Sequence, residues 1–112
     1  MTKGQDRSKQ QEKRITKTLS QIQSNVRRQK ASGSMWYQKS DVVSEAFQIE
    51  AKTRASPARQ ITVKKEWMEK IEEEAFQAGK TPVLAISFGD NQDYFVLKAE
   101  DLIELIEKGA GR

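Results

Sequence analysis

The first third of the chain carries apolar residues at helical spacing. From about residue 7 to residue 30 they recur at steps of four, three and four, at Ile15, Leu19, Ile22 and Val26. This spacing places them on one stripe of a helix. Glu12, three residues before Ile15, continues the stripe, so the pattern puts an acid on the side of the helix that faces the core. Residues 1–8 are polar and are expected to form a flexible basic segment.

The next part of the chain predicts strands. Residues 31–34, Ala-Ser-Gly-Ser, indicate a loop, and a short strand is expected at 35–37. Further strands are predicted at 41–43 and 47–53, joined near residues 44–46. In the strand at 47–53 apolar or small residues alternate with polar ones, which is typical of a half-buried strand. The two alternating sets are Phe47, Ile49, Ala51 and Thr53, and Gln48, Glu50 and Lys52.

The second half of the chain predicts a helix, two strands and a final helix. The helix at 62–78 has apolar residues spaced by four, with Thr62 as its N-cap and Gly79 as its stop. The apolar run at 82–88 predicts a central strand that is buried on both faces. A turn at 89–92, a strand at 94–97 and a helix from 99 to about 109 follow. The expected fold is a single α/β domain over residues 9–112, with helices flanking a mixed sheet.

Composition narrows the possible chemistry. The chain has no cysteine and no histidine, which excludes disulfides, thiolate zinc sites and histidine acid–base catalysis. A metal site would need oxygen ligands, which favours Mg²⁺ or Mn²⁺. Residues 1–30 hold nine Lys and Arg against two acids, so a polyanion such as a nucleic acid is the expected partner. No apolar run suits a membrane span or a signal peptide, and a cytoplasmic location is expected.

One group of residues suggests catalysis. Glu50 and Lys52 lie two apart on a predicted strand and therefore project from the same face. If the chain reverses through residues 45–46, Asp41 lies directly opposite Glu50, and a three-residue turn would instead make it a diagonal neighbour. Facing carboxylates repel each other unless a cation lies between them, and a divalent cation beside a lysine suits phosphodiester hydrolysis. The alternative is that Glu50 and Lys52 belong to the solvated face of an edge strand.

Two further features of the sequence support a nuclease. A buried Glu12 would need a partner, which a metal site beside the first helix would supply; otherwise Glu12 lies in water near a frayed helix end. The turn at 32–34 could hold a phosphate through its hydroxyl and N–H groups, or it is an ordinary connector. The residues expected to contact DNA are Lys9, Lys13, Arg27, Arg28, Lys30, Ser32, Gly33 and Ser34.

The order of these residues resembles the PD-(D/E)XK nuclease superfamily, and within it the Holliday junction resolvases of archaeal and phage type. Those enzymes have a helix glutamate, a Ser-Gly turn, a strand aspartate and a Glu-x-Lys strand in that order. The matching positions here are Glu12, Ser32-Gly33, Asp41 and Ile49-Glu50-Ala51-Lys52-Thr53. The stretch from Trp67 through Lys70 and Glu74-Ala75 to residues 79–83 looks like the phage-type members. One departure is Ser40, which stands where the superfamily name has proline.

The resemblance implies a restriction-endonuclease-like core and an Mg²⁺-dependent endonuclease that acts on DNA as a homodimer. It implies that Asp41, Glu50 and the Ala51 carbonyl bind the metal and that Lys52 lies near the attacking water. Glu12 would bind the metal directly or through water, and Ser32 would contact the DNA backbone. Members of phage type make a phage-encoded intracellular protein one possibility.

Several functions remain open on the sequence alone. The main hypothesis is resolution of four-way DNA junctions. The alternatives are a nuclease of the same fold that acts on flaps, nicks or ends, and a non-catalytic DNA-binding accessory protein in recombination. A dimer interface is expected from residues 35–37, from Phe76 and from the last helix, whose apolar residues are Leu102, Ile103, Leu105 and Ile106.

Overall fold

The computed structural model describes residues 3–29 and 40–110. It has three helices and five strands within these ranges; from residue 40 on they follow the expected order, whereas β1 lies in a segment expected to be helical. The elements are α1 (Lys3–Leu19), β1 (Arg27–Arg28), β2 (Val42–Val43), β3 (Phe47–Thr53), α2 (Lys65–Ala78), β4 (Thr81–Ser87), β5 (Tyr94–Val96) and α3 (Ala99–Ala110).

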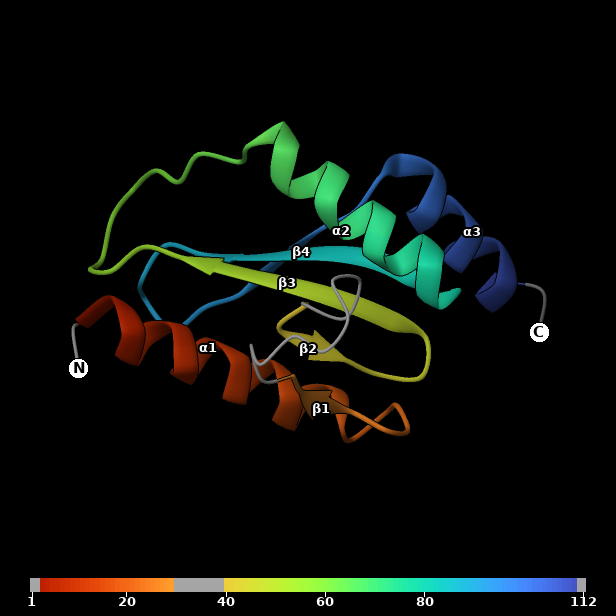
Figure 1. Cartoon of the computed structure of the whole chain (residues 1–112), viewed down its shortest axis with the longest axis horizontal. Helices are drawn as coiled ribbons and strands as arrows, with labels where there is room; N and C mark the ends of the chain where they lie inside the picture. The colour runs from red at the N-terminus through yellow and green to blue at the C-terminus, as the bar shows by residue number, and fades with distance from the viewer. Residues whose placement is uncertain (1–2, 30–39, 111–112) are drawn as a thin grey trace.

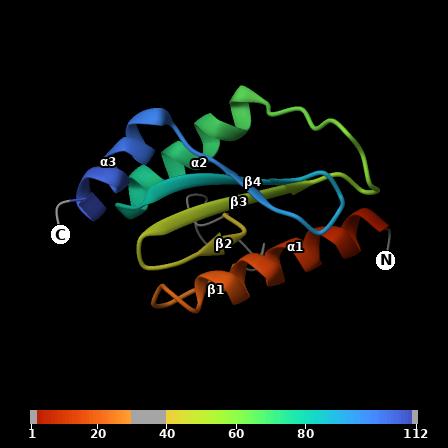
Figure 2. The ribbon, with the colours of Figure 1, turned by 180° about the vertical axis from the view of Figure 1, so that it is seen from behind.

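The strands form one sheet in the order β1-β2-β3-β4-β5. Strands β3 and β4 are parallel, and every other pair of neighbours is antiparallel. Helix α2 is the crossover that a parallel pair requires. In Figure 1, α1 lies on one side of the sheet, whereas α2 and α3 lie on the other, and Figure 2 gives the same arrangement from behind. The predicted α/β architecture around a mixed sheet is therefore confirmed.

The two faces of the sheet carry different side chains. Ile15 and Leu19 of α1 pack on the face formed by Val42, Ile49, Val83 and Ala85. Ile71 and Ala75 of α2 are fully buried, and α2 packs on β3 and β4. Residues 83–87 of β4 are all buried, because helices cover both faces, as the apolar run predicts. Within the described residues, no helix is long and apolar enough to cross a membrane.

The first helix ends at Leu19, so its expected extension to residue 30 is wrong. Ile22 is 77% exposed, and Asn25 has a left-handed backbone with φ 56°, which no helix continues through. The Gln23 side chain accepts hydrogen bonds from Ser44 Oγ and Ala46 N, and ties this segment to the β2–β3 turn. Residues 27–28 then pair with β2. These tertiary contacts outweigh the apolar spacing. Of the four apolar residues in the pattern, only Ile15 and Leu19 lie in the helix.

The start of α1 also differs from the expected layout. The helix begins at Lys3, inside the segment expected to be flexible, and the Arg7 guanidinium donates a hydrogen bond to the Gly89 carbonyl. The division of the chain at residue 8 stays a prediction. The loop and strand expected at 31–34 and 35–37 lie outside the described residues.

Strand β3 is covered more completely than its alternation predicts. Gln48, Ile49 and Glu50 are all buried, because β2 and β4 flank the strand and helices cover both of its faces. The expectation of a half-buried strand is wrong for this reason. The same placement excludes the alternative in which Glu50 belongs to a solvated edge strand.

The boundaries of α2 are half predicted. The helix begins at Lys65, after an extended Lys64 that makes no side-chain capping bond, so the expectation of Thr62 as N-cap is wrong. The C-terminal stop at Gly79 is confirmed. Gly79 has φ 69°, and its N–H donates to the carbonyls of Ala75 and Phe76. A left-handed residue at this position favours glycine.

Candidate active site

Asp41 and Glu50 form a facing pair of carboxylates. Val42 pairs with Ile49 and Val43 with Gln48, so the same register places Asp41 opposite Glu50. Residues directly opposite each other in an antiparallel pair share a face of the sheet. The Ala51 N–H donates a 2.8 Å hydrogen bond to Asp41 Oδ2, which fixes this carboxylate against β3. The structure therefore brings together the two acids that the sequence analysis pairs.

Two lysines contact Glu50 from different elements. Lys52 Nζ of β3 lies 3.5 Å from Glu50 Oε2, and Lys70 Nζ of α2 lies 3.6 Å from Glu50 Oε1. The Lys52 ammonium also lies over the Trp67 ring, 4.8 Å from its centroid. Lys52 is where the sequence analysis expects a lysine, whereas Lys70 was given no role there. The sequence shows only that Lys70 and Glu74 are four residues apart and so share a side of the helix. That this side faces Glu50 of β3 follows from the packing of α2 on the sheet.

The acids are held in a poorly solvated environment. Burial, and after it the charge of Asp41, raises the pKa of Glu50 to about 7, although Lys70 and Lys52 oppose the shift. Burial also raises the pKa of Asp41, against the hydrogen bond from Ala51 and the charges of both lysines. Desolvation disfavours the charged form of a carboxyl group. A further cation between the two acids would be stabilised there.

Glu12 approaches this pair from the other side of the sheet. Arg28 Nε of β1 donates a 3.1 Å hydrogen bond to Glu12 Oε1. Burial, followed by the charge of Asp41, raises the pKa of Glu12, and Arg28 and Lys9 oppose the shift. The Glu12 side chain is 18% exposed, so it lies at the border of the core. The charge of Arg28 thus acts on both Glu12 and Asp41, and its side chain is paired with Glu12.

Gln11 is a site residue that the sequence analysis missed. Its side chain is fully buried, and Nε2 donates hydrogen bonds to the carbonyls of Lys52, at 3.1 Å, and Ala85, at 3.3 Å. Gln11 Oε1 is buried and accepts no hydrogen bond within the described part of the chain. The sequence signal for Gln11 is its spacing of four from Ile15, which places it on the buried stripe of α1. Glu12 lies at the edge of that stripe.

The donor set fits an oxygen-liganded divalent cation. Asp41 and Glu50 supply carboxylates, and Glu50 Oε1 is buried without a hydrogen bond in the described structure. The Lys70 ammonium lies 3.6 Å from that oxygen. Among residues 3–29 and 40–110, no three acids are close enough to form a complete metal cage. Backbone carbonyl, water or phosphate oxygens would therefore complete the coordination.

The residues expected to contact DNA are partly described. Lys9 and Lys13 are exposed on α1, and Arg27 and Arg28 are exposed on β1. These four lie on the helix and the strand that border Glu12. The other expected contacts, Lys30, Ser32, Gly33 and Ser34, lie outside the described residues.

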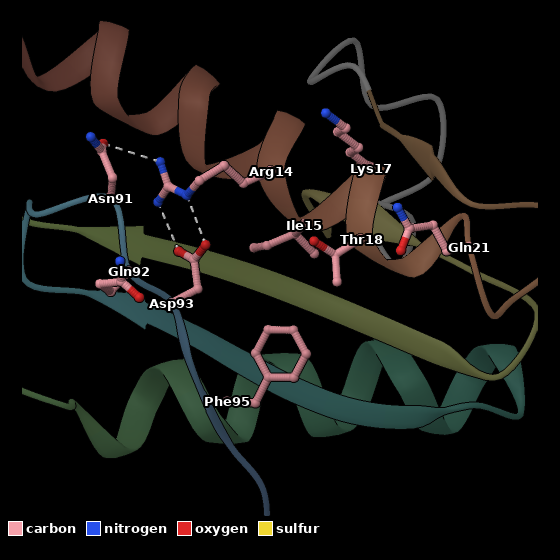
Figure 3. A pocket seen from close by; sticks show the side chains of 9 residues that line it. All are labelled: Arg14, Ile15, Lys17, Thr18, Gln21, Asn91, Gln92, Asp93 and Phe95. Atoms are coloured by element: carbon pink, nitrogen blue, oxygen red, sulfur yellow. Dashed lines mark hydrogen bonds and ion pairs between the residues drawn. The ribbon is translucent and has the colours of Figure 1, made fainter.

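A groove of about 650 Å³ lies apart from the candidate site, between α1 and the β4–β5 turn. Figure 3 shows Arg14 reaching across it to Asp93 and Asn91. The Arg14–Asp93 contact is bidentate, with both distances 2.9 Å, and raises the pKa of Arg14 through the hydrogen bond. The Arg14–Asp93 contact joins α1 to the β4–β5 turn. None of the expected site residues lines the groove.

Comparison with known families gives an assignment that agrees with this geometry. A family model described as archaeal Holliday junction resolvase (Hjc) matches residues 3–110. No curated protein matches the chain. The matched range contains α1, the facing carboxylates of β2 and β3, the Glu-x-Lys strand and the helices on both sides of the sheet. The chain belongs to the archaeal Holliday junction resolvase family, whose members are endonucleases that resolve four-way DNA junctions.

Proposed function

We propose that this Holliday junction-resolving endonuclease cuts DNA at the site formed by Asp41, Glu50 and Lys52, and that Mg²⁺ or Mn²⁺ is its metal. The observation that carries the proposal is the register of β2 and β3, which sets Asp41 opposite Glu50, with Lys52 Nζ 3.5 Å from the Glu50 carboxylate. The absence of histidine and cysteine from the chain leaves oxygen ligands as the ordinary means of holding a catalytic metal here.

Each residue has a distinct part in the proposed reaction. Asp41, Glu50 and the Ala51 carbonyl would hold the cation, and Glu12 would reach it directly or through water. A bound divalent cation supplies positive charge for the phosphate oxygens and lowers the pKa of water. Lys52 donates hydrogen bonds that orient the attacking water, and its charge offsets the negative charge that develops on the phosphate. The Trp67 ring, 4.8 Å from Lys52 Nζ, limits where that ammonium can lie.

DNA binding is assigned to the basic surface beside the site. Lys9 and Lys13 of α1 and Arg27 and Arg28 of β1 would contact phosphates. Lys30, Ser32, Gly33 and Ser34, which lie outside the described residues, are proposed as further contacts. Phosphate contacts position a protein on DNA without reading its sequence. A surface of this kind suits recognition of branched DNA by shape.

The proposed working unit is a two-fold dimer. Resolution requires symmetric cuts in two strands of like polarity, and one chain carries one such site. A two-fold pair supplies two sites and is the commonest closed oligomer. Support comes from large apolar side chains that α2 and α3 leave exposed: Phe76, Leu102, Ile103 and Ile106. Large apolar side chains exposed together are typical of a protein interface.

One gel experiment tests the proposal. End-labelled four-way junction, flap and linear duplex are incubated with the protein in Mg²⁺, in Mn²⁺, in Ca²⁺ and in EDTA. We expect paired cuts in the junction with Mg²⁺ or Mn²⁺, and binding with little cleavage in Ca²⁺, whose looser coordination does not fix the water. Asp41→Asn, Glu50→Gln and Lys52→Ala should each abolish cleavage yet bind the junction within several-fold of the parent, because cationic contacts dominate affinity.

The matched control is Glu45→Gln, which removes an exposed acid from the β2–β3 turn and should cut like the parent. Parent-like cleavage by Glu50→Gln in Mg²⁺ would overturn the site. Full cleavage in EDTA would overturn the metal. Flap cutting that exceeds junction cutting would change the preferred substrate.

A further inference from the structure

Helix α2 buries an acid against the sheet where an apolar residue would be expected. Glu74 is 2% exposed and lies on the same side of the helix as Ile71 and Ala75, which are both fully buried. A buried carboxylate is destabilising unless it is paired and hydrogen-bonded. Its contacts therefore indicate what Glu74 does.

Glu74 holds the residue before Asp41. Ser40 is fully buried, and its hydroxyl donates a 2.5 Å hydrogen bond to Glu74 Oε2. Ser40 stands where the superfamily name has proline, a residue that fixes the backbone through its ring but has no hydroxyl. In this chain a hydrogen bond to α2 anchors the start of β2 instead.

Glu74 also contacts the lysine that touches Glu50. Lys70, one turn earlier on α2, has its Nζ 4.0 Å from Glu74 Oε1 and 3.6 Å from Glu50 Oε1. The Lys70 ammonium is thus shared between an acid on the helix and an acid on β3. One carboxylate is therefore connected to both strands of the candidate metal site, through Ser40 to Asp41 and through Lys70 to Glu50.

A purely structural role does not explain this arrangement well. A leucine at position 74 would fill the helix–sheet interface without a buried charge, and substitution of buried ionic groups by packed apolar ones is often neutral or stabilising. The charge of Glu74 also opposes ionisation of Glu50. The buried charge of Glu74 therefore destabilises the metal-free site. Its contacts lead to the two acids of that site, Asp41 and Glu50.

We propose that Glu74 is a positioning residue for the metal-binding carboxylates, which orients Asp41 through Ser40 and Glu50 through Lys70. The inference rests on the proposed metal site. Residues that orient metal ligands affect metal affinity and activity by about 10- to 100-fold when they are removed. Glu74 itself is not assigned as a ligand, since it does not complete a three-acid cage with the other described acids.

The test measures metal affinity without DNA. Mg²⁺ and Mn²⁺ are titrated calorimetrically into the full chain and into Glu74→Leu, Glu74→Gln, Ser40→Ala and Lys70→Met. We expect Glu74→Leu to weaken binding by about 10- to 100-fold. Glu74→Gln should weaken it less, because its amide oxygen still accepts the Ser40 hydrogen bond. Glu73→Gln, which removes an exposed acid from the preceding position of α2, is the matched control and should bind like the parent.

A double-mutant cycle separates positioning from general damage. Ser40→Ala should weaken metal binding in the parent but have no further effect in Glu74→Leu, because its partner is already gone. In cleavage assays excess Mg²⁺ should restore kcat to Glu74→Gln, with KM for the junction unchanged. If Glu74→Leu does not fold, Glu74→Gln and Ser40→Ala still decide the matter.

Two failures are distinguishable. If Asp41→Asn and Glu50→Gln bind metal like the parent, the proposed metal site is wrong. If those two variants lose metal but Glu74→Gln and Ser40→Ala keep parental affinity, only the positioning role is overturned. Additive effects of Ser40→Ala and Glu74→Leu would likewise overturn it.

Discussion

At the scale of single residues, Glu50 couples the site to pH. Its folded-state pKa is about 7 against an ordinary value of 4.5, so between these values the unfolded chain is ionised while the folded chain still holds the proton. The folded state then binds more protons, and stability falls as pH rises through this interval. Burial is the main cause of the raised pKa of Glu50; the charges of Asp41 and Glu74 add to it, and those of Lys70 and Lys52 oppose it.

The prediction concerns metal-free protein. Its free energy of unfolding should fall from pH 4.5 to pH 7 and then level off, and Glu50→Gln should remove up to about 3 kcal/mol of that fall. Urea denaturation in EDTA at several pH values measures both chains. Metal affinity should rise over the same interval, because the cation competes with the proton. A parent and a Glu50→Gln variant with the same pH profile would refute the shift.

Trp67 offers a second test at this scale. Its ring faces the Lys52 ammonium at 4.8 Å, and a cation–π contact is worth about 0.5–2 kcal/mol. Trp67→Leu should lower kcat by about threefold to thirtyfold at saturating metal, whereas Trp67→Phe should retain more of the activity. Metal affinity should be unchanged in both variants, which single-turnover cleavage and calorimetry together would establish. Equal kcat in the leucine and phenylalanine variants would show that an aromatic ring at position 67 does not assist Lys52.

The sequence brings out the proposed site residues more readily than the residues that support them. Asp41, Glu50 and Lys52 come together because two short strands joined by a tight turn leave few registers, and one of these sets the acids opposite each other. Gln11, Lys70 and Glu74 could not be assigned in this way. Their roles depend on which sheet face each helix covers, and local spacing does not contain that information.

At the scale of elements, the same limit appears at the end of α1. The apolar stripe continues to Val26, but the chain leaves the helix after Leu19 because Gln23 bonds to the β2–β3 turn and Asn25 takes a left-handed conformation. Helix α2, strand β4 and Gly79 are predicted well, since their patterns are long or depend on a local backbone requirement. Thr62 is a counterexample. Threonine is a common N-cap residue, but α2 begins after Lys64 instead.

The docking of α1 can be tested through Gln11. The side chain joins the helix to β3 and β4 through the carbonyls of Lys52 and Ala85. Gln11→Leu should lower the free energy of unfolding by about 1–3 kcal/mol, because two buried carbonyls lose a donor. Gln10→Leu, at the neighbouring exposed position, is the control. Equal denaturation midpoints for the two variants would show that these hydrogen bonds do not secure the helix.

At the scale of the whole molecule, α3 is poorly covered. Its Lys98 end is fastened to α2 by a 3.5 Å ion pair with Glu72, yet Leu102, Ile103 and Ile106 are exposed. Phe76, which is 83% exposed, lies on the adjoining helix, and both views show α2 and α3 side by side (Figures 1 and 2). In the proposed two-fold dimer, a second copy of the chain would cover this surface.

Substitutions on this surface should therefore separate binding from resolution. Phe76→Glu combined with Ile106→Glu should give a particle of one chain mass, 12.8 kDa, in sedimentation equilibrium at micromolar concentration, against about twice that mass for the parent. The variant should nick junctions without paired cuts. Gln77→Glu, exposed on the same helix, should remain dimeric. A monomeric parent, both free and on the junction, would refute the dimer.

The attachment of α1 has a consequence for synthesis. Gln11 and Arg14 flank Glu12, and their partners Ala85 and Asp93 lie on β4 and in the following turn. A nascent chain therefore makes Glu12 early but lacks the surface that receives it until residue 93 has been added. Truncated chains that end at residue 80 should show no nuclease activity in a coupled translation assay. Synthesis of residue 93 therefore has to precede the docking of α1, and a shorter chain lacks contacts that hold Glu12 in place.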